Sequence, residues 1–331
     1  MPILVVVTPA PQLECVPNVS EGRRPIVIEA LTESITAVEG VRLLHRDVGV
    51  DANRTVFTFV GDPLPVRLAA KQLAAACLEH IDLREYSGTH PYIGALDVCP
   101  FVPLWGLDAT EAEAAALALA RYSAETLGVP AYLYAKSATR KSYRSLARVR
   151  QGGLAAVAKR SPANGPDFGT GIHPTAGASV FGARDILIAY NVNLATKDAA
   201  VAKTIAAHIR ASNRESGLPA VRAIGWYQEA FGCAQVSCNL LDYRVTGLGE
   251  VYRAVDAHAR TLGTQAAGSE LIGLVPEEAL GAVPRQFGEA DPDTSSAVNQ
   301  AAQLLGLDRV RDWRAEERVL EWVFWRKPKL P

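Results

Sequence analysis

Apolar and polar positions along the chain follow two periods, one typical of strands and the other typical of helices. Residues 54–61 alternate strictly, with Thr and Phe on one face and Val and Thr on the other, which predicts a strand with two unlike faces. From Pro63 to about Asp82 the apolar residues recur at helical spacing, so we expect a helix there. The residues on the apolar stripe of this helix are Val66, Ala69, Ala70, Leu73, Cys77 and Ile81.

The two patterns occur in the same order twice. The first copy consists of a strand at 12–18, a helix at 25–37, strands at 41–49 and 54–61, a helix at 63–82 and a strand at 94–104. The second consists of a strand at 184–194, a helix at 197–212, strands at 220–229 and 234–243, a helix at 248–262 and a strand at 268–275. This β-α-β-β-α-β order is the split βαβ arrangement. We therefore expect an α/β (α+β) chain of two ferredoxin-like subdomains, spanning residues 10–180 and 181–331.

The segments outside the two copies are less regular. Between them we expect a helix at 109–127, a strand at 131–135, a basic stretch and a long loop rich in Gly and Pro at 161–177. A loop of this length within a compact protein is usually functional or disordered. From Glu277 onward we expect two or more helices, followed by an apolar segment, "VLEWVFW", that is either a docked terminal strand or an oligomer contact.

Composition excludes several classes of protein. Hydrophobic residues make up 49% of the 331 residues and the net charge is −1, so no global field favours nucleic acid or an anionic membrane. The apolar run at 3–7 is too short for a signal segment or a membrane span, and we expect a cytoplasmic, soluble protein. The five cysteines form no C-x-x-C pair, which predicts reduced, mostly buried thiols and no structural zinc.

One histidine occupies a constrained turn. His90 stands in "GTHPYIG", where Pro91 restricts it to extended geometry and the flanking glycines permit a close approach by a ligand. Two interpretations stay open at this point: the imidazole bonds only to nearby backbone, or it is directed at a substrate.

Polar side chains are also expected together at one end of the first hairpin. Asp47 ends one strand, and Asn53 and Arg54 begin the next, so the three groups share one end of the sheet. They either pair with one another or hold a charged ligand, because a guanidinium binds a carboxylate as a two-pronged fork.

Two other segments allow similar alternatives. In the strand 234–243, Gln235, Ser237 and Asn239 share one face, which either meets water or lines a polar pocket. The Gly/Pro-rich loop carries a second His-Pro step at His173, which is typical either of a ligand cradle or of an ordinary surface connection.

Seven stretches together resemble the glutamate formimidoyltransferase family, the formiminotransferases of histidine breakdown. They are "ECVPNVSEG" (14–22), "NRTVFTFVG" (53–61), "HPYIGALDVCPFVPL" (90–104), "PDFG" (166–169), "AIGWY" (223–227), "AQVSCNLLD" (234–242) and "GSELIGLVP" (268–276). The resemblance extends from about Gln12 to about Trp322. It implies two ferredoxin-like halves with a ligand cleft or tunnel for folate between them.

The resemblance also implies an activity and a site. The family transfers the formimino group of N-formimino-L-glutamate to N5 of tetrahydrofolate, which acts as acceptor co-substrate, without a metal. Its catalytic histidine and nearby aspartate match His90 and Asp47. Its folate-contacting loop matches Gly169, Thr170, Gly171, Ile172, His173, Pro174, Thr175, Ala176 and Gly177. Because the sequence ends at Pro331, we expect the single-function form without the cyclodeaminase domain to which the animal proteins are fused.

The donor has two carboxylates, so its site needs cationic or amide partners. Our candidates are Arg54, Asn53 and Asn18. The partners that we expect are therefore small molecules and a second copy of the chain in a homodimer, with no nucleic acid and no membrane. Alternatives are transfer of a formyl group from 5-formyltetrahydrofolate to glutamate, a folate-binding homologue without catalysis, and a structural dimer module.

Overall fold

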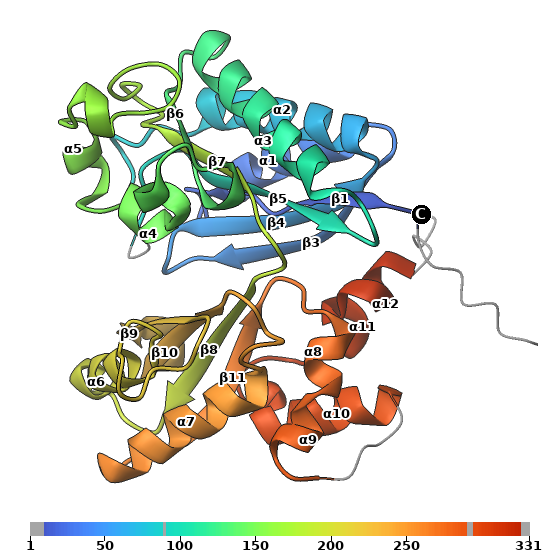
Figure 1. Cartoon of the computed structure of the whole chain (residues 1–331), viewed down its shortest axis with the longest axis vertical. Coiled ribbons are helices and arrows are strands. Elements are labelled where there is room, and N and C mark those ends of the chain that lie inside the picture. Colours follow the sequence, from blue (N-terminus) through green and yellow to red (C-terminus); the bar gives the residue numbers. More distant parts are fainter. Residues whose placement is uncertain (1–9, 89–90, 290–293, 326–331) are drawn as a thin grey trace, which may run out of the picture. The chain divides into compact units, whose positions relative to one another are not determined.

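The structure is a computed structural model that describes residues 10–88, 91–289 and 294–325. The chain divides into two compact units, residues 1–184 and 185–331, and each is described here by itself. In both units a sheet is covered on one face by helices (Figure 1).

The sheet of the first unit has seven strands. They are β1 (Gln12–Cys15), β2 (Asn18–Val19), β3 (Val41–Gly49), β4 (Arg54–Gly61), β5 (Leu96–Leu104), β6 (Ala131–Leu133) and β7 (Ser179–Ala183). Strands β1 and β2 lie between β4 and β5, and β3 pairs with the outer side of β4, all antiparallel. Strands β7 and β6 extend the sheet beyond β5 in parallel. The first five strands thus give the ferredoxin-like order, with the first strand split in two.

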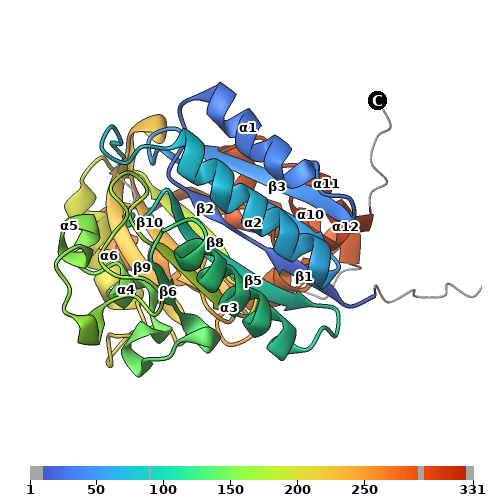
Figure 2. The same cartoon turned by 90° about the horizontal axis from the view of Figure 1, so that it is seen from above.

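Three helices cover one face of this sheet and lie side by side in Figure 2. They are α1 (Pro25–Thr36), α2 (Pro63–His80) and α3 (Ala109–Glu125). Proline stands in the first turn of α1 and α2, where its missing N–H removes no helical hydrogen bond. Their apolar stripes pack on Phe57, Phe59, Phe101 and Phe181 of the strands, all fully buried.

The opposite face of the sheet has two parts. Beside β5, β6 and β7 a small second core contains Ile93, Val98, Tyr132, Val149 and Val157, with the short helices α4 (Leu146–Val149) and α5 (Gly153–Val157). On the strands from β3 to β1 the same face carries polar side chains. By register these are Glu14, Asn18, Asp47, Arg54 and Thr58.

The second unit repeats the ferredoxin-like order. Its strands are β8 (Ile188–Leu194), β9 (Val221–Gln228), β10 (Cys233–Leu240) and β11 (Ala266–Ile272), arranged as β11-β8-β10-β9, all antiparallel. Its helices are α6 (Ala199–Ile209), α7 (Leu248–Thr261), α8 (Glu277–Gly281), α9 (Val283–Gln286), α10 (Thr294–Leu305), α11 (Ala315–Arg318) and α12 (Leu320–Trp325). A separate core fills the space between this sheet and α6, α7 and α10.

The two-subdomain α/β prediction is confirmed, and three details of the sequence interpretation are wrong. The expected first strand is broken at Val16 and Pro17. Strand β7 was not expected. Of the two alternatives for "VLEWVFW", the docked strand is wrong, since helix α12 spans Leu320–Trp325 and a short apolar run fits a helix as well as a strand, whereas the oligomer contact stays a prediction.

Candidate active site

The segment that leads to the histidine is fastened to the turn between β3 and β4. The Tyr86 hydroxyl lies 2.8 Å from the Asn53 carbonyl oxygen and 3.1 Å from that of Ala52. Asn53 Nδ2 donates to the Ser87 carbonyl at 2.9 Å, and its Oδ1 accepts from the Gly22 N–H at 2.9 Å. Asn53 also has a positive φ of 46°, a conformation that asparagine tolerates better than most residues. Its side chain therefore joins three segments of backbone.

His90, the predicted catalytic residue, lies outside the described residues. The segment that follows it is held as firmly as the segment before. Ser20 contacts this segment twice, with Oγ donating to the Gly94 carbonyl at 2.7 Å and the backbone N–H donating to the Ala95 carbonyl at 2.8 Å. The Ile93 N–H donates to Asp97 Oδ1 at 2.8 Å. Both flanks of the histidine are thus tied to the sheet.

The predicted folate loop lies directly against these flanks. Gly94 and Gly177 form an isolated antiparallel bridge, the Ala95 N–H donates to the Ala176 carbonyl at 2.9 Å, and the Ala178 N–H donates to the Ile93 carbonyl at 2.8 Å. A Cβ added at Gly177 would lie 2.2 Å from the Ile93 oxygen, so the contact requires glycine. Two segments more than 70 residues apart in the sequence therefore meet by backbone contact (94 against 177).

His173 stabilises the turn of the predicted folate loop, residues 169–177. Its Nδ1 accepts hydrogen bonds from the backbone N–H groups of Thr175 and Ala176 at 3.3 and 3.2 Å. Its backbone exchanges two hydrogen bonds with Gly177, at 2.7 and 3.0 Å. One ring nitrogen therefore holds the local turn, and Nε2 is the nitrogen left for a ligand.

Asp47, Arg54 and Asn18 lie on the polar face of the first sheet. Val56 pairs with Asp47 on one side and with Asn18 on the other, so the three side chains share a face. Asp47 is buried, and its Oδ2 lies 3.8 Å from His45 Nε2. Asn18 Nδ2 contacts only the Val16 carbonyl, at 3.4 Å, among the described residues.

The guanidinium of Arg54 is the donor with the most unused capacity. Among the described residues it makes no hydrogen bond or ion pair, and its Nε is hidden from solvent. Burial lowers the pKa of Arg54, the carboxylate of Asp47 raises it, and the positive charge of Arg150 lowers it again. An ion pair between Asp47 and Arg54, one of the two sequence alternatives, is absent from the described residues.

Two further charged residues that the sequence interpretation did not single out belong to this cluster. Asp97, at the start of β5, is 2% exposed and forms a short ion pair with Arg150 Nη2. The signal for Asp97 was a lone carboxylate within the apolar stretch "IGALDVCPF". The signal for Arg150 was weaker, because it is one of eight basic residues between 136 and 160.

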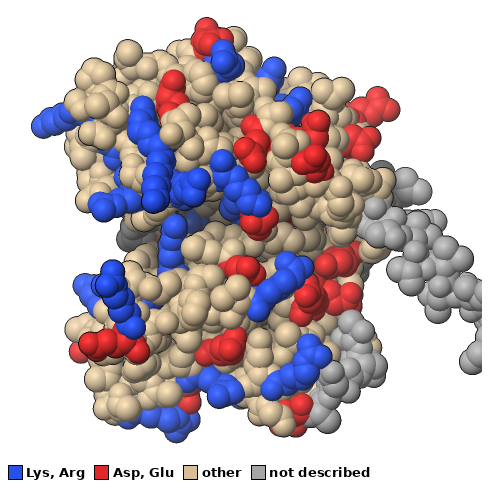
Figure 3. Space-filling model, viewed as in Figure 1, with Lys and Arg blue, Asp and Glu red and all other residues tan. Residues whose placement is uncertain are grey.

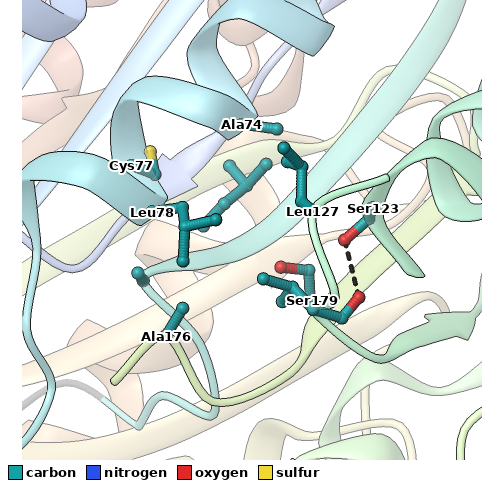
Figure 4. Close-up of a pocket in the computed structure, with 10 residues that line it drawn as sticks. Ala74, Cys77, Leu78, Ser123, Leu127, Ala176 and Ser179 are labelled. Carbon is teal, nitrogen blue, oxygen red and sulfur yellow. Dashed lines mark hydrogen bonds between the residues drawn. The ribbon is translucent and has the colours of Figure 1, made fainter. Parts of the chain in front are cut away.

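A cavity behind the folate loop is too small for a substrate. It has a volume of about 10 Å³ and lies among α2, α3, β5 and Ala176 (Figure 4). The Ser123 hydroxyl at its edge already donates to the Val129 carbonyl at 2.9 Å. A space of this size is at the lower limit for one water molecule.

The polar face of β10 has a gradient of burial. Gln235 is fully buried, Ser237 is half-buried and Asn239 is exposed, so both sequence alternatives apply to different parts of one strand. Gln235 Nε2 donates to Asn193 Oδ1 at 2.7 Å and to Glu270 Oε1 at 3.1 Å, and its Oε1 accepts from Trp226 Nε1 at 2.8 Å. These bonds satisfy the Gln235 amide within the second unit.

The described part of the chain contains neither a candidate metal site nor a candidate membrane-spanning helix. No three His, Cys, Asp or Glu side chains converge there in a way that could hold a metal ion. None of the helices in the same residues combines the length and the apolar character that crossing a bilayer requires.

Comparison with known proteins identifies the family to which these features belong. The formiminotransferase domain, N-terminal subdomain, matches residues 12–184, and the formiminotransferase domain matches residues 189–325. The chain therefore belongs to the formiminotransferase family.

Individual relatives cover the chain to different extents. A formimidoyltransferase-cyclodeaminase of Gallus gallus is 40% identical over 94% of this chain, which spans only 59% of that protein. The glutamate formimidoyltransferase of Streptococcus pyogenes serotype M1 is 39% identical over 81% of this chain and 90% of its own length. That of Thermoplasma acidophilum is 38% identical, with 81% and 89% covered.

Proposed function

We propose that the chain is a glutamate formimidoyltransferase that moves the formimino group of N-formimino-L-glutamate to N5 of tetrahydrofolate. Family membership supports the reaction class, and the relatives from Streptococcus pyogenes and Thermoplasma acidophilum, both glutamate formimidoyltransferases, support the reaction. The observation that carries the proposal is the backbone contact between the flank of His90 and the loop 169–177. It supports a catalytic group and a folate-contacting loop acting at one place, within residues 10–180 of the N-terminal subdomain.

The proposed role of His90 is to move a proton. When N5 attacks the formimino carbon, N5 must lose a proton, and the nitrogen of the departing glutamate must gain one. An imidazole with an ordinary pKa near 6.5 is able to accept the first proton and supply the second. A buried carboxylate at Asp47 would stabilise the positive charge of the amidine or of the imidazolium.

The other predicted site residues have distinct proposed roles. Arg54, which has unused N–H groups, binds a carboxylate of N-formimino-L-glutamate. Asn18 contributes an amide to the same face of the sheet. Asn53, whose side chain is bonded at both ends to backbone, positions the segment before the histidine. The loop Gly169–Gly177 contacts folate and excludes water, which limits hydrolysis of the intermediate. The cleft between the two subdomains stays a prediction.

Replacement of His90 tests the catalytic proposal. We expect His90→Ala to lower kcat by about 10²- to 10⁴-fold, the usual contribution of a positioned acid–base group, with little change in tetrahydrofolate binding. His208→Ala, at an exposed histidine of α6, is the matched control and should transfer at the parent rate. Turnover of His90→Ala within a few-fold of the parent would show that the proton is moved by another group. Assay of 5-formyltetrahydrofolate with glutamate in parallel distinguishes the formyl-transfer alternative.

The proposal also includes an oligomeric state and a cellular compartment. We expect a homodimer in the cytoplasm, by resemblance to the family. All five cysteines are free thiols, including Cys15 and Cys99 with sulfur atoms 3.3 Å apart, which supports a reducing compartment.

A further inference from the structure

We propose that Arg150, oriented by Asp97, acts with Arg54 to bind the two carboxylates of the amino-acid donor. The inference rests on the proposed function and adds to it a residue that determines donor specificity. It starts from where the sheet places three charged residues that are distant in sequence.

Strand register brings Arg54 and Asp97 to one face of the sheet. Val19 of β2 pairs with Thr55 on one side and with Leu96 on the other, and Asn18 pairs with Val56 and Val98. Residue 97 is therefore left over, in a bulge between the two rungs. At this bulge the alternation of side chains between the two faces of β5 shifts by one residue. Leu96 lies in the helix-covered core, and Val98 lies in the small core on the opposite face. Arg54 and Asp97 are then separated by β2, and they are close enough for the charge of Asp97 to raise the pKa of Arg54.

Helix α4 delivers Arg150 to the same place. Val149, its last residue, is fully buried in the small core beside Ile93 and Val98. The next residue is Arg150, whose Nη2 pairs with Asp97 Oδ2. Asp97 Oδ1 is at the same time bonded to the Ile93 N–H, so the carboxylate cannot turn away from its position. Arg150 is thus held by a group that is itself held next to the histidine segment.

Both guanidiniums retain donors for an anion. The Nε atoms of Arg54 and Arg150 are hidden from solvent and have no acceptor among the described residues. A buried donor without an acceptor is unfavourable, and a carboxylate satisfies two donors of a guanidinium at once. Two such forks match a substrate with two carboxylates, as the proposed donor has.

The surrounding surface favours the approach of an anion. Residues 136–160 contain eight Lys or Arg and no Asp or Glu. Lys and Arg side chains gather over this part of the first unit in Figure 3. A cluster of one sign raises the local concentration of an oppositely charged substrate. The buried carboxylates of Asp47 and Asp97 offset the positive charges of Arg54 and Arg150.

The test compares donors that lack one carboxylate. N-formimino-L-glutamate, its γ-amide and its α-amide are assayed with the parent and with Arg150→Gln. We expect Arg150→Gln to raise the KM of the natural donor by about 10- to 100-fold, as for a lost charge-assisted hydrogen bond, with the KM of tetrahydrofolate nearly unchanged. For one of the two amides the substitution should have little further effect, because the carboxylate that Arg150 binds is already gone.

Two variants control for a structural effect. Arg148→Gln changes an exposed arginine of the same short helix and should behave as the parent with all three donors. Arg150→Lys keeps the charge and the pairing with Asp97 but removes the fork, so the same comparison applies if Arg150→Gln fails to fold. The proposal is overturned if Arg150 variants weaken all three donors by the same factor, or if donor KM stays at the parent value.

Binding of L-glutamate, the expected product, separates this inference from the proposed function. Suppose that calorimetry shows L-glutamate binding that depends on Arg150, but the protein transfers no formimino group to tetrahydrofolate. The carboxylate site would then be supported and the proposed reaction would be wrong. If the Arg150 variants transfer the formimino group with unchanged donor preference, the proposed function would be supported and the role of Arg150 would be wrong.

Discussion

At the scale of single residues, Asn53 shows how a polar side chain can join distant backbone segments beside a candidate site. The sequence placed it beside Arg54 at the start of a strand and predicted a substrate contact. In the structure its side chain bonds to Gly22 and Ser87, which lie 31 and 34 positions away in the sequence, and the substrate contact stays a prediction. Its positive φ also explains why asparagine suits the turn.

Two substitutions at Asn53 separate its hydrogen bonds from its backbone conformation. Asn53→Ala removes both bonds and places alanine at positive φ, so we expect a loss of about 2–4 kcal/mol in the free energy of unfolding. Asn53→Gly removes the same bonds without the backbone strain and should lose about 1 kcal/mol less. Urea denaturation measures both values. Parent-like stability of the two variants would contradict the bridging role.

The residue scale also marks the limit of sequence interpretation. The turn chemistry at 51–54 was visible because it depends on neighbouring residues. The partners of Asn53 and the ion pair between Asp97 and Arg150 were not, because both join segments 30 or more residues apart. Arg54 was identified from its residue type, whereas the lack of an acceptor for its Nε within the described part of the chain is a property of the packing around it.

At the scale of elements, the contact between residues 93–95 and 176–178 assembles the candidate site. The contact consists of one isolated bridge, between Gly94 and Gly177, and a backbone hydrogen bond on each side of it. Gly94 and Gly177 make it possible, since a Cβ at either position would lie 2.2 Å from a carbonyl oxygen of the facing segment.

Two glycines of the same loop give a matched comparison. Gly171 and Gly177 have similar φ values, 64° and 69°, but a Cβ at Gly171 would meet nothing within 4 Å. Gly171→Ala should therefore lose only the backbone preference, about 1 kcal/mol in the free energy of unfolding. Gly177→Ala should lose at least about 2 kcal/mol more and weaken folate binding, because the two segments must separate. Equal effects in urea denaturation and in folate titration would argue against this contact.

The elements themselves were predicted well where local pattern decides. The five helices predicted with bounds (α1, α2, α3, α6 and α7) and the strands of both ferredoxin-like units lie within a few residues of those bounds. Strand β7 was not predicted because its five residues, "SVFGA", are too few to show a clear alternation of apolar and polar positions. Residues 135–164 were predicted only as a basic stretch and a loop. Their short helical turns depend on Tyr132 and Tyr143, whose rings contact Arg160.

At the scale of the whole molecule, each unit has its own apolar core, and the cysteines are distributed between them. Cys15, Cys77 and Cys99 belong to the core of the first unit, and Cys238 to that of the second. Only Cys233 is partly accessible. The thiols therefore report the integrity of each core separately.

Thiol reactivity at pH 8 tests this arrangement. Burial raises the pKa of Cys238 to about 12 and also raises that of Cys15 and Cys77. A raised pKa reduces the thiolate fraction at this pH, so these thiols should react slowly even when reached. Burial also raises the pKa of Cys233, so its partial exposure is what distinguishes it. We expect one rapid equivalent with Ellman's reagent, assigned to Cys233, and the remaining thiols only on unfolding. Cys233→Ser should abolish the rapid phase, and a persistent phase would mean that one of the cores opens readily.

Strand β7 has a consequence for how the protein is made. It is the last strand of the first unit in the chain, yet it lies between β5 and β6, and the loop just before it supplies the partners of residues 93–95. A nascent polypeptide that has emerged only as far as residue 160 carries the histidine and all the strands up to β6. It still lacks residues 176–178, which form backbone hydrogen bonds with residues 93–95. The candidate site is therefore completed only after β7 has been synthesised, near the middle of the chain, when this last strand inserts into the sheet.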